Sequence, residues 1–275
     1  MLCIKKISIF EVMRVKFVIR NIGKKLKQLT SQLIDKIDLL LYKHEECELV
    51  IVTGADTSHY KSLNQFLLSL YVHEPSIRVI VVDLGFTLEE RQSLKSCFPT
   101  IELRLFDYSM YPDYFNIKIN AGEYAWKPVI FSEILKEFKC CVCWMDAGNK
   151  ITAPLFGIRR ITKAIGMYSP HSSGYVSTWT HPKMLEFMDV SNSLLSKNNL
   201  NGACVSVDYQ NQRAMSIVSK WEDCAMTKGC IAPIGSSRKN HRQDQAALSV
   251  LAHQSGITKN MTGRLHGFVI HQDID

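Results

Sequence analysis

The chain has 275 residues and a mass of 31.4 kDa, enough for one large domain with a sizeable core. Hydrophobic residues make up 46% and charged residues 21%, which excludes a disordered, collagen-like or repeat protein. The formal charge of +7 lies entirely in residues 1–44, where ten Lys and Arg accompany three acidic residues. A nucleic-acid-binding protein is expected to carry a basic face on its folded body, so this distribution argues against nucleic acid as a partner.

The apolar runs are of strand length and fall far short of the about 20 residues that a membrane-spanning helix needs. Basic residues interrupt the apolar ones in residues 1–20, unlike the continuous apolar segment of a secretion signal. Three of the nine Cys, Cys140, Cys141 and Cys143, share one apolar run without the spacing of a zinc site. We therefore expect a cytoplasmic protein with reduced, structural thiols.

Residues 1–46 form a basic N-terminal extension. Apolar and basic residues alternate over 4–19, which favours one or two strands, and the period becomes helical over 24–42, with Lys on the outer face. This amphipathic helix either packs on the domain or holds residues 1–44 against the anionic inner face of a membrane.

From residue 47 the pattern is that of a single α/β domain extending to residue 275. Buried strands are expected over 49–53, 77–82, 101–106 and 140–144, separated by helices over 58–71, after Thr87 and over 126–138. Thr87 and Glu90 have the spacing of a capping box. Such alternation predicts a mostly parallel central sheet with helices on both faces, and ligands bind beyond the carboxyl ends of its strands.

The second half of the chain has a weaker pattern. Strands are expected over 165–168 and 203–207, helices over 211–227 and 243–253, and an irregular tail over 258–275.

Polar residues follow the first strand in Thr53, Gly54 and Asp56. A glycine there lets the backbone approach a ligand, and the carboxylate can accept from a ribose or a base. A tight turn explains the same residues when they stand alone. No G-x-G-x-x-G or P-loop occurs in the chain, so no phosphate-binding glycine loop supports an NAD, S-adenosylmethionine or ATP site.

Asp146 and Asn149 follow the strand over 140–144, where a carboxylate and a second oxygen ligand suit Mg²⁺ or Mn²⁺ bridging a diphosphate. A structural Asp in a turn is the alternative. His266 and His271 become further candidate ligands if the tail folds over the site.

Lys127, before Pro128 near a helix start, combines a cation with backbone donors for a phosphate, unless it is simply a solvated lysine. Asn201, Gly202, Asp244 and Gln245 introduce polar groups among apolar ones. Helix capping by Asp244 is the alternative for the last pair.

Together these segments resemble the glycosyltransferase-A (GT-A) superfold over about residues 49–250. The motifs, in order, are VTGAD, VVDLG, YAWKP, WMDAGN, NG and RQDQ. They are most similar to an uncharacterised nucleotide-diphospho-sugar-transferase-like family with a vvDLG, YxWKP and WmD pattern, and more distantly to the glycogenin and galactosyltransferase group. The resemblance implies a Rossmann-like GT-A domain that binds a nucleotide sugar.

The resemblance also implies roles for the residues. Thr53, Gly54, Asp56 and Asp83 would lie near the nucleoside, Lys127 near phosphate, and Asp146 at the metal–diphosphate position. Asn201 and Gly202 would line the donor sugar, with Asp244 and Gln245 near the sugar or acceptor.

The expected activity is transfer of a hexose from a UDP-type sugar to a glycan or lipid-linked acceptor, with Asp244 and Lys127 catalytic. Two alternatives stay open. One is a catalytically degenerate GT-A-like binding protein, which the missing second carboxylate motivates. The other is a Rossmann-like methyltransferase that uses residues 82–85 as its cofactor turn.

Overall fold

The computed structural model describes residues 48–261 and 263–274, together with Thr30 and Leu33. The expected strands and helix of the N-terminal extension, its boundary at residue 46 and its membrane contact lie outside these residues and stay predictions. Among the described residues, no helix combines the length and apolar character needed to cross a bilayer.

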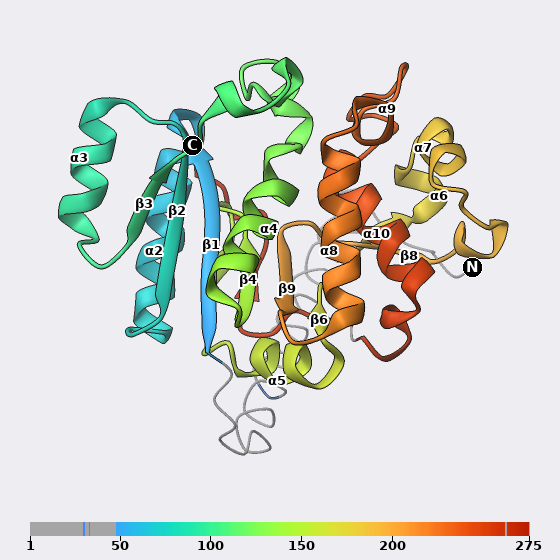
Figure 1. Cartoon of the computed structure of the whole chain (residues 1–275). Helices are drawn as coiled ribbons and strands as arrows, with labels where there is room; N and C mark the ends of the chain where they lie inside the picture. The colour runs from blue at the N-terminus through green and yellow to red at the C-terminus, as the bar shows by residue number, and fades with distance from the viewer. Residues whose placement is uncertain (1–29, 31–32, 34–47, 262, 275) are drawn as a thin grey trace, which may run out of the picture.

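A six-stranded sheet forms the centre of the molecule, in the order β3-β2-β1-β4-β9-β6 (Figure 1). Its strands are β3 (Glu102–Leu105), β2 (Arg78–Gly85), β1 (Leu49–Asp56), β4 (Cys141–Met145), β9 (Cys204–Asp208) and β6 (Met167–Tyr168). The first four strands are parallel, whereas β9 runs antiparallel to both β4 and β6. The expected mostly parallel α/β sheet is therefore confirmed, and the antiparallel strand marks where its pattern changes.

Each face of the sheet has its own hydrophobic core, because successive side chains of a strand point to opposite faces. Val50 and Val52 of β1 belong to the core beneath α4, α8 and α10. Leu49 and Ile51 belong to the core beneath α2, α3 and α5. A strand buried on both faces needs an unbroken apolar run, as in LVIV at the start of β1.

Helices cover both faces of this sheet, and α4 and α8 lie side by side over one of them (Figure 1). The longer helices are α2 (Tyr60–His73), α3 (Leu88–Cys97), α4 (Trp126–Phe138), α5 (Phe156–Ile165), α8 (Gln212–Ala225) and α10 (Gln243–Ser255). Short helices are α6 (Val176–Trp179), α7 (Pro182–Phe187) and α9 (Lys228–Ile231). The capping box of Thr87 and Glu90 is present at the start of α3, as expected.

Six short 3-10 helices connect these elements in the described residues. They are η1 (Thr57–His59), η2 (Tyr108–Met110), η3 (Asp113–Phe115), η4 (Asn120–Tyr124), η5 (Asn192–Leu194) and η6 (Ile257–Asn260). All five residues of η4 have a positive φ, so this segment is a left-handed turn directly before α4.

The expectation of an irregular tail over 258–275 is wrong in part. Strand β10 (Phe268–Val269) pairs with β5 (Lys150–Ile151) in a small antiparallel sheet, and β7 (His171–Tyr175) pairs with β8 (Asn198–Leu200) in another. Beyond β10, Gln272 bonds to Gly148 and to Gln65 of α2. Two-residue strands leave no periodicity in a sequence, which is why the tail resembled a loop.

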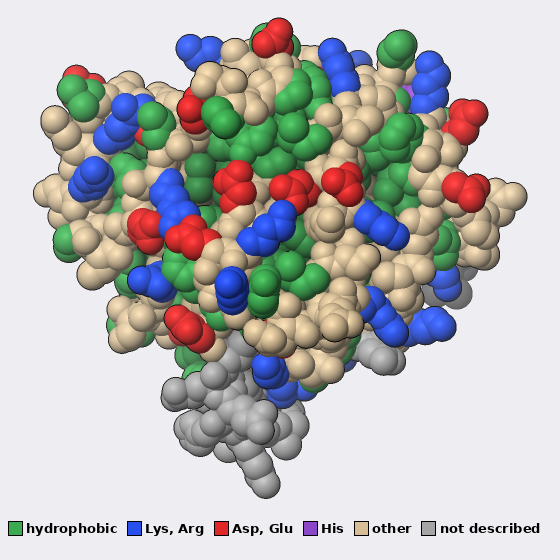
Figure 2. Space-filling model, viewed as in Figure 1, with side chains coloured by type: hydrophobic (Ala, Val, Ile, Leu, Met, Phe, Trp, Pro, Cys, Tyr) green, Lys and Arg blue, Asp and Glu red, His purple; other side chains and the backbone are tan. Residues whose placement is uncertain are grey.

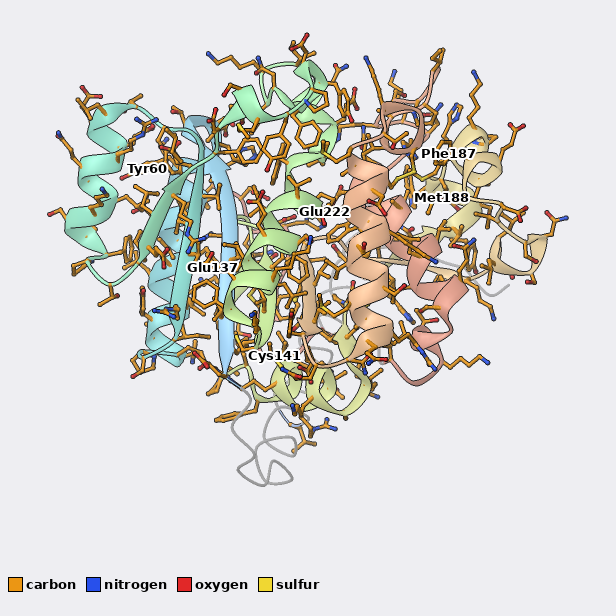
Figure 3. All side chains as sticks on the ribbon, in the orientation of Figure 1. Tyr60, Glu137, Cys141, Phe187, Met188 and Glu222 are labelled. Atoms are coloured by element: carbon orange, nitrogen blue, oxygen red, sulfur yellow. A yellow bond between two sulfur atoms is a disulfide. The ribbon has the colours of Figure 1, made fainter. Side chains whose placement is uncertain are left out.

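The expectation of reduced thiols throughout is also wrong. Cys224, at the end of α8, forms a disulfide with Cys230 in α9, and Cys141 at the start of β4 is disulfide-bonded as well (Figure 3). Cys97, Cys140, Cys143 and Cys204 are free. Disulfides persist mainly in oxidising compartments, so these bonds count against the cytoplasmic location that the sequence suggested.

On the face seen in Figure 2, Lys and Arg side chains are mixed with Asp and Glu rather than gathered into one patch. This agrees with the balanced charge of the chain after residue 44.

Candidate active site

A two-lobed cleft lies beyond the carboxyl ends of β1, β2 and β4. The larger lobe, of about 420 Å³, contacts the turn after β1 and the Asp146–Asn149 turn after β4. The smaller lobe, of about 200 Å³, extends towards Asn201 and the start of α10. Both lobes share the side chains of Tyr124, Lys127, Asp146, Ala203, Arg238 and His271. The cleft therefore lies where parallel sheets bind ligands.

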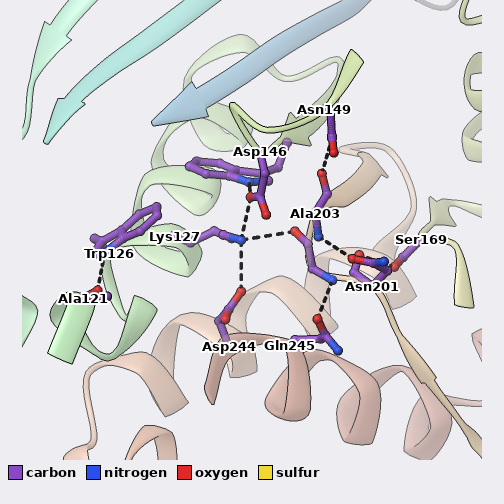
Figure 4. Close-up of polar contacts among 12 residues, drawn as sticks. Ala121, Trp126, Lys127, Asp146, Asn149, Ser169, Asn201, Ala203, Asp244 and Gln245 are labelled. Carbon is purple, nitrogen blue, oxygen red and sulfur yellow. Dashed lines mark hydrogen bonds and ion pairs between the residues drawn. The ribbon is translucent and has the colours of Figure 1, made fainter. Parts of the chain in front are cut away.

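A buried lysine joins the two lobes (Figure 4). Lys127 Nζ donates to Asp146 Oδ1 at 2.8 Å and to the carbonyl of Gly202 at 3.2 Å, and it lies 3.4 Å from Asp244 Oδ2. The side chains of Lys127 and Asp244 are 4% and 7% exposed, whereas that of Asp146 is 40% exposed. Lys127 is thus an internal bridge between two carboxylates rather than a solvated lysine.

Opposing effects set the protonation of this cluster. Burial alone lowers the pKa of Lys127, but the charges of Asp146 and Asp244 outweigh it and leave that pKa raised. Burial raises the pKa of Asp244 despite the attraction of Lys127. Asp244 Oδ2 accepts no hydrogen bond within the described residues. The same oxygen is buried and lies 3.4 Å from Lys127 Nζ, while the Asp244 side chain as a whole lines the smaller lobe.

Local structure fixes the positions of Asp146 and Lys127. The indole Nε1 of Trp144 donates to Asp146 Oδ1 at 2.6 Å, which holds the carboxylate over the end of β4. The left-handed turn η4 places Tyr124 in the cleft and starts α4, whose second residue is Lys127. At its centre, a side chain on Gly122 would come within 2.2 Å of the carbonyl of Phe115, so only glycine fits.

The segment before β9 forms the wall of the smaller lobe. Asn201 Oδ1 accepts from the amide of Ala203 at 2.9 Å, and Gln245 Oε1 accepts from that of Gly202 at 3.4 Å. A Cβ on Gly202 would lie 3.1 Å from Asp244 Oδ2, so the glycine leaves room for this carboxylate. The structure thus brings Asn201, Gly202, Asp244 and Gln245 together, as the sequence suggested.

The residues expected near a nucleoside divide into two groups. Gly54 and Asp56 line the larger lobe, whereas Thr53 and Asp83 do not. Asp83 is 2% exposed and is used within the fold: it accepts from the amides of Gly85 and Phe86 and pairs with Arg91. The structure therefore gives Asp83 a role in the turn after β2 and keeps it away from the cleft.

The donors expected for a divalent cation come together only in part. Asp146 and Asn149 line the larger lobe, and Asn149 Oδ1 accepts no hydrogen bond within the described residues. One oxygen of Asp146 is occupied by Lys127 and Trp144. Of the two tail histidines, His271 lines both lobes, whereas His266 packs edge-on against Tyr168 and lines neither. In the part of the chain that the structure describes, no three His, Cys, Asp or Glu side chains are grouped so as to hold a metal, so the expected cation stays a prediction.

Arg238 and Asp273 line the cleft although the sequence analysis gave them no role. His271 and Asp273 reach the larger lobe because the tail returns along the Asp146–Asn149 turn, and Arg238 and Arg242 come from the loop between α9 and α10. Single polar residues in segments without periodicity carry no spacing signal, whereas Arg242 is the first residue of the RQDQ motif.

Comparisons with known proteins support the fold. Residues 11–132 match a family of proteins of unknown function, DUF1647, and no curated protein matches the sequence. The structure is similar to WbbM, a bifunctional glycosyltransferase, with a TM-score of 0.50 and 11% identity over 80% of this chain. This chain spans 39% of WbbM's length.

It is also similar to core-mannan synthase A from Aspergillus fumigatus, solved with Mn and GDP. That TM-score is 0.51 with 9% identity, over 77% of this chain and 71% of the other. The resemblance to GT-A glycosyltransferases expected from the sequence motifs is therefore confirmed at the level of the fold.

Proposed function

We propose that this protein is a glycosyltransferase that moves a sugar, with a hexose expected, from a nucleotide-diphosphate donor to a glycan or lipid-linked acceptor. Three observations support the proposal: the GT-A fold, the two-lobed cleft at the strand ends, and the buried cluster at the junction of its lobes. The single observation that carries it is the buried pair of Asp244 and Lys127, whose side chains line the smaller lobe.

In this reaction the bond between the anomeric carbon and the diphosphate breaks, and a bond from an acceptor hydroxyl to that carbon forms. The hydroxyl proton passes to a base, and the nucleoside diphosphate leaves with the bonding electron pair. Asp244 is our candidate for the group that holds that hydroxyl or the donor sugar, because its raised pKa suits proton transfer better than that of an exposed carboxylate. Lys127 keeps Asp244 and Asp146 in place and offsets their charge.

The larger lobe is our candidate for binding the nucleoside of the donor, and a UDP-sugar is the favoured donor. Gly54 and Asp56 line it where the backbone of β1 ends. A divalent cation bound by Asp146 and Asn149 stays a prediction, which the assay below tests with and without Mn²⁺. We leave out the cytoplasmic location because of the disulfides.

The test is release of nucleoside diphosphate from UDP-glucose, UDP-galactose, UDP-N-acetylglucosamine and GDP-mannose, with and without Mn²⁺ and a panel of acceptor glycans. Asp244→Asn is expected to lower kcat about 100-fold or more while donor binding persists. Asp223→Asn, an exposed carboxylate on α8, is the matched control and should leave the rate unchanged.

Donor binding without release from any sugar nucleotide would instead favour the degenerate binding protein. Binding of S-adenosylmethionine with no affinity for sugar nucleotides would favour the methyltransferase.

A further inference from the structure

Two arginines in the cleft have no acidic partner. Arg238 and Arg242 come from the loop between α9 and α10, Arg238 at the junction of the lobes and Arg242 in the smaller one. In the described part of the chain, neither guanidinium has a carboxylate within 4.0 Å, although other surface arginines do, such as Arg104 and Arg159. The cleft therefore carries two positive charges that the protein itself does not neutralise.

Aromatic rings hold both guanidinium groups. Arg242 lies over the ring of Trp179, with its guanidinium carbon 4.3 Å from the ring centre, and its backbone amide donates to the carbonyl of Trp179 at 3.0 Å. Arg238 lies over Tyr124, 5.0 Å from the ring centre. Stacking contacts the flat face of a guanidinium and leaves its edge N–H groups free for an anion.

The loop that carries the arginines is internally fixed. Asn240 Oδ1 accepts from the amide of Ser237 at 2.7 Å, and its Nδ2 donates to the carbonyl of Gly235 at 3.1 Å. Next along the chain, the buried ring of His241 accepts from the amide of His181 through Nδ1 and contacts the carbonyl of Ile231 through Nε2. Arg238 and Arg242 therefore project from a preorganised loop, which lowers the entropic cost of binding.

Keeping two like charges close together costs free energy unless an anion binds between them. Partial burial and the charge of Arg242 lower the pKa of Arg238, and the charge of Asp244 opposes them. Among the described residues, no three His, Cys, Asp or Glu side chains are grouped to hold a metal, and Lys127 already contacts Asp146 and Asp244.

We propose that Arg238 and Arg242 bind the diphosphate of the donor and supply the positive charge that a divalent cation would otherwise provide. This inference rests on the proposed function for the identity of the anion as a donor diphosphate. Guanidinium groups match phosphate oxygens in pairs, and Arg238 borders both the candidate nucleoside lobe and the lobe that contains Asp244. A diphosphate at this junction places its sugar beside Asp244.

The test uses inorganic pyrophosphate as the probe, with binding measured by calorimetry in EDTA. The unchanged protein should bind it, Arg238→Gln and Arg242→Gln should each weaken binding about 10-fold or more, and the double variant should lose it. Lys239→Gln removes an exposed neighbouring charge that lines neither lobe, and it should bind as the unchanged protein does. Thermal unfolding of each variant shows whether weaker binding reflects a loss of folding. The milder variants Arg238→Lys and Arg242→Lys keep the charge and help to separate lost contacts from lost stability.

Three results would overturn the inference. The first is pyrophosphate binding that requires Mn²⁺, and the second is normal pyrophosphate binding by the arginine variants. The third uses glucuronate as a second probe: the arginine variants would lose glucuronate binding but keep pyrophosphate binding. The last would assign the arginines to a sugar carboxylate. If pyrophosphate binds through the arginines but no sugar nucleotide reacts, the anion site stands and the transferase proposal fails.

Discussion

Two ion pairs, one in each half of the central sheet, differ in their surroundings. In the first half, β3, β2 and β1, Arg104 contacts Glu137 at 2.6 Å, and their side chains are 29% and 49% exposed (Figure 3). In the second half, Lys127 contacts Asp146 at a similar distance of 2.8 Å, but Lys127 is 4% exposed.

The difference lies in the surroundings rather than in the bond. Water solvates either partner of an exposed pair once the other is removed, so such a pair contributes little. A buried charge without its partner keeps its full desolvation cost. The first half therefore serves mainly as a scaffold whose backbone ends line the cleft, while the second half holds charges that a ligand can use. The four predictions below test this contrast, from the largest effect to the smallest.

Lys127→Met should have the largest effect, because it leaves the buried Asp244 carboxylate without its cation. We expect a loss of about 3–5 kcal/mol in the free energy of unfolding at pH 7, measured by urea denaturation. The loss should shrink as the pH falls, since burial has raised the pKa of Asp244 and protonation removes its charge. Lys136→Met, which removes an exposed lysine from the same helix and its contact with Glu222, is the control. An equal loss in both variants would contradict the contrast.

His241 should make the second half sensitive to acid. Burial lowers its pKa to about 4, below the 6.5 expected when unfolded. The folded state prefers the neutral ring, so its stabilising effect is complete above pH 6.5 and is lost as the pH falls through about 4. The shift corresponds to roughly 3 kcal/mol.

The measurement for His241 is the slope of unfolding free energy against pH between 6.5 and 4. It should be shallower in His241→Gln than in the unchanged protein. His73→Gln, at the end of α2 in the first half, is the control and should keep the original slope. Identical slopes for all three proteins would show that His241 does not titrate as described.

The disulfide between Cys224 and Cys230 should contribute less. It closes a short loop, with a sequence separation of 6, and chain-entropy arguments give about 2 kcal/mol for such a loop. Cys224→Ser with Cys230→Ser should lower the free energy of unfolding by that amount under oxidising conditions. Dithiothreitol should destabilise the unchanged protein by reducing this bond. The double variant has no bond between α8 and α9 for it to reduce. Equal stability of the two proteins without reductant would be the contrary result.

Arg104→Met should have the smallest effect, although it breaks contacts with both Glu102 and Glu137. Because all three side chains are partly in water, we expect a loss of at most about 1 kcal/mol by urea denaturation, decreasing further in 0.5 M salt. A loss as large as that of Lys127→Met would mean that burial does not separate the two halves.

The same division explains how much the sequence predicted. The central strands β1, β2 and β4 are buried on both faces, so their apolar runs identify them within a few residues. The pattern also indicated α4 with its observed bounds. No comparable signal predicts the antiparallel direction of β9 or the two-residue strands β6, β5 and β10. These features depend on pairing with strands that lie far apart in the chain.

For the site, the residues at strand ends were the predictable ones. Asp146 and Gly54 follow apolar runs directly, so the general position of a parallel-sheet cleft places them. The pairing of Lys127 with two carboxylates was not predictable, because it depends on the left-handed turn η4 and on the approach of α10. The positions of Arg238, Arg242 and His271 in the cleft depend on the paths of loops. Of the two tail histidines considered as ligands, His271 lines the cleft and His266 does not.

The return of the tail to the cleft has a consequence for synthesis. Ile274 bonds to Ser62, 212 positions earlier, and Asp273 lies against Gly148. A chain emerging from the ribosome can pair β1 with β2 early, but the pocket wall beside β4 is completed only after residues 273 and 274 have emerged as well. Contacts across such long separations form slowly because the intervening chain must first be ordered. Ligand binding by stalled, growing chains is therefore expected to lag behind formation of the sheet.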